Sequence, residues 1–154
     1  MGYIMHLRKK IGHEELLTAG TGVFPVRSGK VLLQRRADNG LWTMHGGAIE
    51  IGEVPEDAAK REFFEETGLR ANALELIGVF SGPDTRYTYP NGDKVFIVGI
   101  FYLCMDFSGE VNIDPNEVRE LKWFPLGSLP AVEEISPPDR RVFAAFSEFM
   151  KNRI

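Results

Sequence analysis

Four glutamates gather around one short predicted helix, and their type and spacing suit metal binding. Glu62, Glu65 and Glu66 fall within the helix, and Glu53 precedes it. At about 100° per residue, Glu65 lies roughly 60° to one side of Glu62 and Glu66 roughly 40° to the other, so the three carboxylates share one face. Like charges at this spacing repel each other, which costs roughly 0.2–0.5 kcal/mol per pair even on an exposed helix. The pattern therefore predicts a positive partner for this face.

The acidic face is expected to turn toward the interior of the protein. Ala58 and Ala59 lie on the same face and would let the helix approach a sheet closely, whereas Lys60 and Phe64 point the other way. Carboxylate oxygens suit Mg²⁺ or Mn²⁺, hard cations that commonly carry phosphate groups. The alternative is a solvated acidic face that is neutralised by Arg61 alone.

The residues around these glutamates are similar to the Nudix box, GX5EX7REUXEEXGU, in which U is an apolar residue. The match runs from Gly47 through Glu53, Arg61-Glu62-Phe63 and Glu65-Glu66 to Gly68-Leu69, at every fixed position. Two departures are Phe63, where the family usually has an aliphatic residue, and His45, where many relatives have proline. The resemblance implies an α/β fold, an α/β/α sandwich with a mixed central sheet, in which residues 47–69 form a loop, helix, loop unit.

The resemblance also implies a metal site and an activity. Glu62 and Glu66 would be metal ligands, Glu65 would contribute directly or through water, and a main-chain carbonyl near Gly47 would complete the site. The metal would be Mg²⁺, with Mn²⁺ as the alternative. The reaction would be water attack on phosphorus in a nucleoside diphosphate linked to another group.

Two further box residues carry implied catalytic roles beside Glu65. Arg61 would hold the carboxylates by hydrogen bonding. Glu53 would bind metal or help to deprotonate the attacking water. Relatives place the general base either in the box or on a later loop, so its identity stays open here.

Residues outside the box are expected to select the substrate. Arg35 and Arg36 end a predicted strand on opposite faces, and Arg35 is the one favoured to hold a phosphate or pair with the acidic site. Tyr87 could stack on a base, with cross-strand packing as the alternative. Glu117 resembles a loop carboxylate that reaches the metal site in many Nudix enzymes, and Glu120 is the fallback. A solvated surface position is the alternative for each charged residue.

The elements that must position these residues follow from periodicity and turn signals. Before the box, we expect a short helix or arm over residues 3–11 and an antiparallel pair of strands over 17–26 and 31–35. The box helix runs from Pro55 to Gly68. After it come a strand over 74–80, a hairpin of strands over 86–89 and 94–105, a last strand near Trp123 and a terminal amphipathic helix over 139–151. His45 has no partner at metal-ligand spacing and is expected to hydrogen-bond the backbone or the pocket edge.

Length and charge set limits on domains and partners. The 154 residues fit one domain, 1–154, and the formal net charge of −4 with no basic run argues against general nucleic-acid binding. The single cysteine, Cys104, sits in an apolar run and is expected to be a buried thiol in a reducing compartment. No apolar run approaches the roughly 20 residues of a membrane helix, so a cytoplasmic protein is expected. The oligomeric state is left open, with a homodimer among the alternatives.

The substrate depends on residues outside the box. Pro83 lies near the position where ADP-ribose-cleaving relatives carry a proline, which favours ADP-ribose or a related nucleotide sugar, although a simple turn proline is the alternative. A house-cleaning nucleoside triphosphate or dinucleoside polyphosphate pyrophosphohydrolase is the second interpretation. A non-catalytic nucleotide sensor on the same fold, or a metal-stabilised structural domain, would belong to another class.

Overall fold

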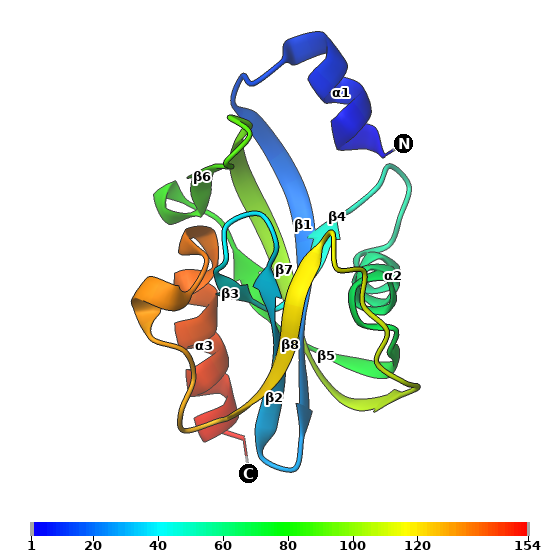
Figure 1. Cartoon of the computed structure of the whole chain (residues 1–154), viewed down its shortest axis with the longest axis vertical. Coiled ribbons are helices and arrows are strands. Elements are labelled where there is room, and N and C mark those ends of the chain that lie inside the picture. The colour runs from blue at the N-terminus through cyan, green and yellow to red at the C-terminus, as the bar shows by residue number, and fades with distance from the viewer. Residues whose placement is uncertain (1, 154) are drawn as a thin grey trace.

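Residues 2–153 are described in a computed structural model, in which three helices surround one sheet. In chain order the elements are α1 (Tyr3–Ile11), β1 (Leu16–Arg27), β2 (Lys30–Arg36), β3 (Trp42–Thr43), β4 (His45–Ala48), α2 (Pro55–Thr67), β5 (Arg70–Phe80), β6 (Arg86–Thr88), β7 (Lys94–Ser108), β8 (Val118–Pro125) and α3 (Arg140–Lys151), with 3₁₀ turns at Pro83–Thr85, Val132–Glu134 and Pro137–Asp139. The sheet lies between α2 on one side and α3 on the other (Figure 1). The predicted α/β/α sandwich is confirmed.

The sheet is mixed, as predicted. Its main path runs β3-β2-β1-β7-β5, while β4 pairs with β1, β6 with β7 and β8 with β2. Strands β1 and β7 are parallel over a long register, from Leu16 beside Val95 to Pro25 beside Cys104, and the other pairs of named strands are antiparallel. Strand β7 is therefore an inner strand, which agrees with its apolar residues on both faces.

Each face of the sheet has its own hydrophobic cluster. On the α3 side, the ring of Phe24 stacks on Phe146 with centroids 4.2 Å apart. On the α2 side, Phe63 is fully buried and meets Phe107 edge-on at 6.1 Å. Burial of one such ring contributes roughly 1.5–3 kcal/mol. The aromatic residue at position 63 is therefore accommodated as a core residue that anchors α2 to the sheet.

Helix α2 has the boundaries that its sequence predicts. Pro55 occupies the first turn, and Gly68 ends the helix in the left-handed conformation at φ 79°, with its N–H donating to the Phe64 carbonyl at 2.8 Å. Ala58 and Ala59 are fully buried. Because these two side chains are small, the helix approaches the sheet closely and carries its acidic residues with it.

Most other predicted elements are present. Residues 3–11 form the helical alternative, β1 and β2 form the predicted antiparallel hairpin, and Tyr89 N–H donates to the Asp93 carbonyl at 2.8 Å in the predicted hairpin of β6 and β7. Strand β5 begins at Arg70, earlier than predicted, and the short strands β3 and β4 were not predicted. No helix in residues 2–153 is long and apolar enough to cross a membrane.

Candidate metal and nucleotide site

Two glutamates of α2 lie directly against the backbone of β4. The N–H of Gly46 donates to Glu66 Oε1 at 2.6 Å, and a Cβ added to Gly47 would lie 2.6 Å from the Glu62 carboxyl carbon. Gly46 in turn faces Gly22 of β1, and a Cβ on Gly46 would collide with the Thr21 carbonyl. The two glycines therefore allow the helix and the two strands to meet without intervening side chains.

Arg61 holds two of the box carboxylates by hydrogen bonds. Its Nε and Nη2 donate to the two oxygens of Glu53 at 2.8 and 2.9 Å, and its Nη1 donates to Glu62 Oε1 at 2.8 Å. The Arg61 hydrogen bonds lower the pKa of Glu53 to about 2, with help from the Glu50 N–H. Glu53 is therefore ionised near neutral pH, and both of its oxygens are already occupied.

The carboxyls of Glu62 and Glu66 have the opposite electrostatic character. Burial raises the pKa of Glu66 to about 8, and the nearby charge of Glu62 raises it further. Hydrogen bonds from the Gln34 amide and the Gly46 N–H act in the opposite direction and lower this pKa. Burial also raises the pKa of Glu62, although Arg61 opposes this, and the charges of Glu65 and Glu117 raise it further. A nearby cation would reverse both shifts, because it favours the ionised form of each carboxyl.

A cavity of about 210 Å³ begins beside Glu66. Gly46, Gly47 and Glu66 form one part of its wall, and Arg36, Tyr89 and Asp139 form another. The Arg36 guanidinium is held by both oxygens of Asp38, at 2.8 and 2.7 Å, and its carbon lies 5.5 Å from the centre of the Tyr89 ring. The cavity thus combines a positive side chain and an aromatic ring with a group of buried acids.

The structure places Arg36, and not Arg35, in the cavity wall. Arg35 Nε donates to the Gly40 carbonyl at 3.0 Å, and its Nη1 lies 3.4 Å from Glu120 Oε1 across the pairing of β2 with β8. Consecutive strand residues point to opposite faces, so one of the pair had to face away. The register of β2 against β8 also shifts between Arg35 and Arg36. The prediction that Arg35 faces the site is therefore wrong, and Arg36 is the arginine that lines the cavity.

Tyr87 also lies outside the cavity wall, and Tyr89 takes that place. The Asn39 side-chain amide donates to the Tyr87 hydroxyl at 3.1 Å, and the two tyrosine rings meet edge-on at 5.0 Å. These contacts agree with the packing alternative for Tyr87.

Comparison with known proteins agrees with this geometry. The family described as NUDIX domain matches residues 16–146, which is most of the chain. The chain belongs to the Nudix family. A MutT-like protein of Streptomyces ambofaciens is 48% identical over 66% of this chain and 59% of its own length. An ADP-ribose pyrophosphatase of Methanocaldococcus jannaschii is 34% identical over 68% of this chain and 59% of its own length. The match thus spans about 59% of the length of these two relatives.

A solved structure supports the same assignment. The crystal structure of a MutT NUDIX hydrolase from Burkholderia pseudomallei superposes with a TM-score of 0.70 at 29% identity, covering 84% of this chain and 98% of that one. The Nudix box of the present chain thus lies on a fold of the same type. Nudix hydrolases use divalent metal ions, so the donor set at the box can be examined for such an ion.

The residues at the Nudix box fit a divalent cation. Glu62 and Glu66 are partly buried carboxylates whose ionised forms a cation would stabilise, and Gly47 lies directly against the Glu62 carboxyl group. Oxygen donors of this kind suit a hard cation. Within residues 2–153, no three histidine, cysteine, aspartate or glutamate side chains already form a metal-binding group.

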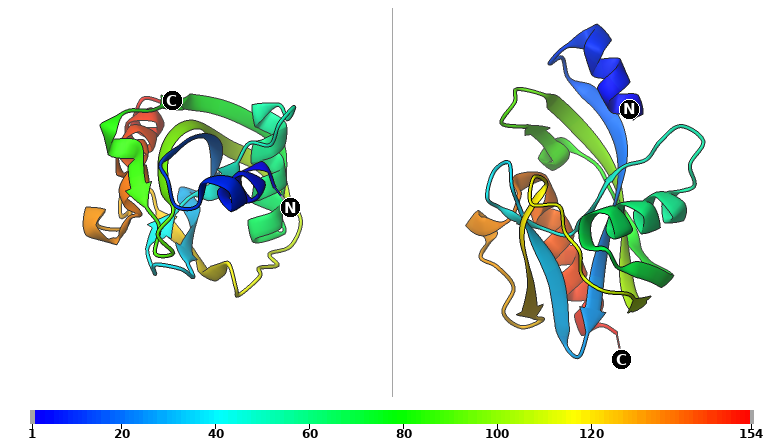
Figure 2. Two further views of the ribbon diagram at one scale, coloured as in Figure 1. Left: turned by 90° about the horizontal axis from the view of Figure 1, so that it is seen from above. Right: turned by 45° about the vertical axis from the view of Figure 1, so that its right-hand side comes forward.

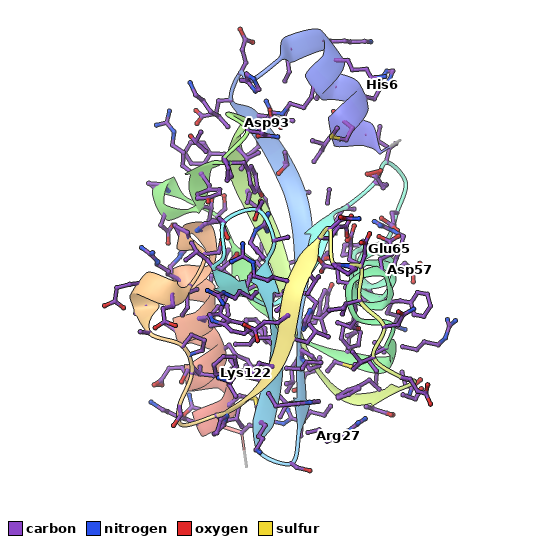
Figure 3. The ribbon with its side chains drawn as sticks, in the orientation of Figure 1. His6, Arg27, Asp57, Glu65, Asp93 and Lys122 are labelled. Atoms are coloured by element: carbon purple, nitrogen blue, oxygen red, sulfur yellow. The ribbon has the colours of Figure 1, made fainter. Side chains whose placement is uncertain are left out.

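The remaining predicted acids lie at the edge of the site. The Glu65 side chain is 52% exposed and lies 3.5 Å from Arg61 (Figure 3). The prediction that all three helical carboxylates turn inward is therefore wrong for Glu65. Its position on the helix, to the opposite side of Glu62 from Glu66, directs it to solvent. Glu117 is exposed in the loop before β8, and its charge acts on Glu62. Glu120 pairs with Arg35 instead.

His45 is a buried structural residue. Its Nε2 donates to the Leu32 carbonyl at 2.8 Å, while the Gln34 amide reaches both His45 Nδ1 at 3.2 Å and the Met44 carbonyl at 3.1 Å. Burial lowers the pKa of His45 to about 4. The imidazole is neutral and its two nitrogens are occupied, which confirms the predicted backbone hydrogen bond.

Asp139 is a cavity residue that the sequence reasoning missed. Thr43 Oγ1 donates to its Oδ2 at 2.7 Å, and burial raises the pKa of Asp139 to about 6. The carboxyl comes from the 3₁₀ turn before α3, far from the Nudix box in the chain. Its only sequence signal was an acidic residue next to a helix start, which is common at helix N-termini whether or not a site is present.

Proposed function

We propose that this Nudix domain is a metal-dependent pyrophosphohydrolase that cleaves a nucleoside diphosphate linked to another group X. The products are a nucleoside monophosphate and a phosphorylated X. The observation that carries the proposal is the pair of partly buried carboxyls, Glu62 and Glu66, placed against the Gly46–Gly47 backbone, with Glu66 in the cavity wall. Buried acids with raised pKa values beside a cavity are typical of functional sites.

The side chains of the box take separate roles in this proposal. Glu62 and Glu66, with the Gly47 carbonyl, hold the divalent cation, which is Mg²⁺ or Mn²⁺. When bound, this ion neutralises the charge of the pyrophosphate and makes a water molecule more acidic. Arg61 keeps Glu62 in position, because it is itself fixed by both oxygens of Glu53. Glu65 remains a candidate for a water-mediated contact at the edge of the site.

Glu117 is the proposed general base, which accepts a proton from the attacking water. Glu53 is a weak base, because Arg61 holds its pKa at about 2. Glu117 lies near enough for its charge to raise the pKa of Glu62, and it sits on a loop that is open to solvent. An exposed carboxylate beside the site can accept a proton and release it to bulk water.

The substrate favoured is ADP-ribose or a related nucleotide sugar. Its nucleoside part would enter the cavity, where Tyr89 offers an aromatic surface and Arg36 and Asp139 offer hydrogen bonds. The similarity to a protein named ADP-ribose pyrophosphatase supports this choice, as does Pro83 in the turn before β6. Nucleoside triphosphates and dinucleoside polyphosphates are the second candidate class, since the same phosphate chemistry would cleave them.

A panel of substrates tests the proposal. Release of nucleoside monophosphate is measured with Mg²⁺, with Mn²⁺ and with EDTA for ADP-ribose, a dinucleoside tetraphosphate and the common and oxidised nucleoside triphosphates. In water enriched with ¹⁸O, the label identifies which phosphorus is attacked. Metal-dependent release from ADP-ribose is expected to be fastest. Tight nucleotide binding without release from any substrate would favour a non-catalytic sensor.

A further inference from the structure

Helix α1 lies outside the part of the chain that matches the family, yet it forms part of the cavity wall. The match begins at residue 16, after α1 ends at Ile11. Ile4 and Arg8, four residues apart and therefore on one face of the helix, line the same cavity as Glu66. Seen from above, α1 crosses the end of the molecule over the sheet (Figure 2). The cavity is thus bounded by a segment added to the Nudix domain.

Hydrogen bonds at both ends of α1 hold it in this position. At its start, the N–H of Tyr3 donates to Glu50 Oε1 at 3.1 Å, in the loop between β4 and α2. Near its end, the buried Arg8 guanidinium donates from Nη2 to the Lys94 carbonyl at 2.6 Å and from Nη1 to the carbonyls of Gly12 and Glu14. Helix α1 therefore bridges the Nudix-box loop and the first residue of β7.

The register of the sheet shows how far α1 lies from the carboxylates. Arg8 donates a hydrogen bond to the carbonyl of Lys94, which precedes Val95 at the start of β7. Phe101 of the same strand lies beside Gly22, which pairs with Gly46 at the carboxylate end. At about 3.3 Å per residue, Val95 and Phe101 are roughly 20 Å apart along β7. Both residues line the cavity, so α1 closes the end away from the metal site.

Two polar atoms of the cavity wall make no hydrogen bond inside the protein. Among the described residues, Arg8 Nε and Thr21 Oγ1 are the buried side-chain polar atoms without a hydrogen bond. Arg8 is 9% exposed and Thr21 is 5% exposed, and both residues line this cavity. Arg8 Nε forms an ion pair with Asp93, labelled in Figure 3 near α1, but the distance of 3.8 Å is too long for a hydrogen bond. A buried donor without a partner is costly, and a bound ligand or water can satisfy it.

We propose that α1 is a substrate-specificity element, in which Ile4 and Arg8 contact the nucleoside end of the substrate. This rests on the proposed function for the phosphate end. Ile4, Val95 and Ile97 supply an apolar surface at this end, and Arg8 Nε supplies a hydrogen bond, while Thr21 Oγ1 lies nearer the carboxylate end, where Thr21 pairs with Gly47. An apolar wall with a few polar groups is the usual environment of a small planar ligand such as a nucleobase.

Methyl NMR of the wild-type protein tests this contact without catalysis. Isoleucine methyl groups are labelled, and each of the four common nucleoside monophosphates is added in turn. The methyl signals of Ile4 and Ile97 are expected to shift together on saturation, whereas Ile11, on the same helix but outside the cavity wall, is expected to stay in place. Shifts at Ile97 without Ile4, or no shift with any of the four, would overturn the proposal.

Two variants extend the test to activity. Ile4→Ala is expected to raise KM for the preferred substrate about tenfold with kcat nearly unchanged. Met5→Ala is the matched control, because Met5 is 59% exposed on the same helix and lies outside this cavity. Equal KM values for Ile4→Ala and Met5→Ala would overturn the proposal that α1 contributes to substrate specificity. If the wild-type protein cleaves no substrate, the proposed function fails, while the NMR result still decides the role of α1.

Discussion

Replacement of Glu66 by glutamine should stabilise the metal-free protein while it abolishes most activity. Glu66 has an ordinary pKa of 4.5 and a folded-state pKa of about 8, because its carboxyl is buried. The folded protein must therefore keep this group protonated at pH 7, whereas the unfolded chain ionises it. The pKa difference that acts at pH 7 is about 2.5 units, which corresponds to at most about 3 kcal/mol of lost stability. Glutamine is neutral and can still accept the Gly46 N–H.

The sign of the effect depends on pH and on metal. The folded pKa is raised, so the wild-type protein loses stability as pH rises from about 4.5 to about 8, and the variant does not. In EDTA at pH 7, Glu66→Gln should melt up to about 10 °C higher than wild type, and the difference should vanish near pH 4.5. With saturating Mg²⁺ the wild-type protein should gain stability and the variant should gain much less. Turnover of the variant should fall at least about a hundredfold.

Thermal melting and steady-state turnover measure these two effects separately. Glu148→Gln is the matched control, since Glu148 is exposed on α3 and the substitution changes the net charge equally. A Glu66→Gln protein that melts lower than wild type in EDTA at pH 7 would refute the argument from burial. A variant with near-normal turnover would refute the assignment of Glu66 as a metal ligand, whatever its stability.

Three further substitutions test the other parts of the site. Asp139→Asn should stabilise the protein at pH 7 by at most about 3 kcal/mol and leave its stability unchanged at pH 4. The reason is that the folded-state pKa of about 6 makes the wild-type protein lose stability as pH rises from about 4 to 6. Equal differences in melting temperature at both pH values would contradict this. Arg36→Gln should raise KM roughly tenfold, while Arg35→Gln should leave it nearly unchanged, and the reverse order would restore Arg35 to the site. Glu117→Gln should lower kcat, and an unaltered kcat would return Glu117 to the role of a surface residue.

Local patterns in the sequence were sufficient to predict the chemistry of the box. A helix repeats every 3.6 residues, so the spacing of Glu62 and Glu66 placed them on one face before any tertiary contact was known. Pro55 and Gly68 act within one turn of the helix, and both predicted ends are observed. The buried Phe63 likewise follows from the position of one apolar residue on that helix.

The walls of the cavity could be found only in the tertiary structure. Thr43 meets Asp139 because Trp42 pairs with Ile135 and accepts the Ser136 N–H, contacts between segments far apart in the chain. Ile4 shares a cavity with Glu66 because β1 pairs with both β4 and β7. No local rule specifies such contacts, since they depend on how the whole sheet is ordered.

The same distinction explains the wrong predictions. Strand alternation showed that Arg35 and Arg36 face opposite sides, but the side on which the cavity lies depends on where the segment of Ser136, Pro138 and Asp139 packs. The outward position of Glu65 likewise depends on where β4 packs against α2. The sequence by itself thus determined which carboxylates share one face of the box helix. Only the packing of distant segments decided which side chains surround the substrate, because a cavity is formed between elements and belongs to none of them alone.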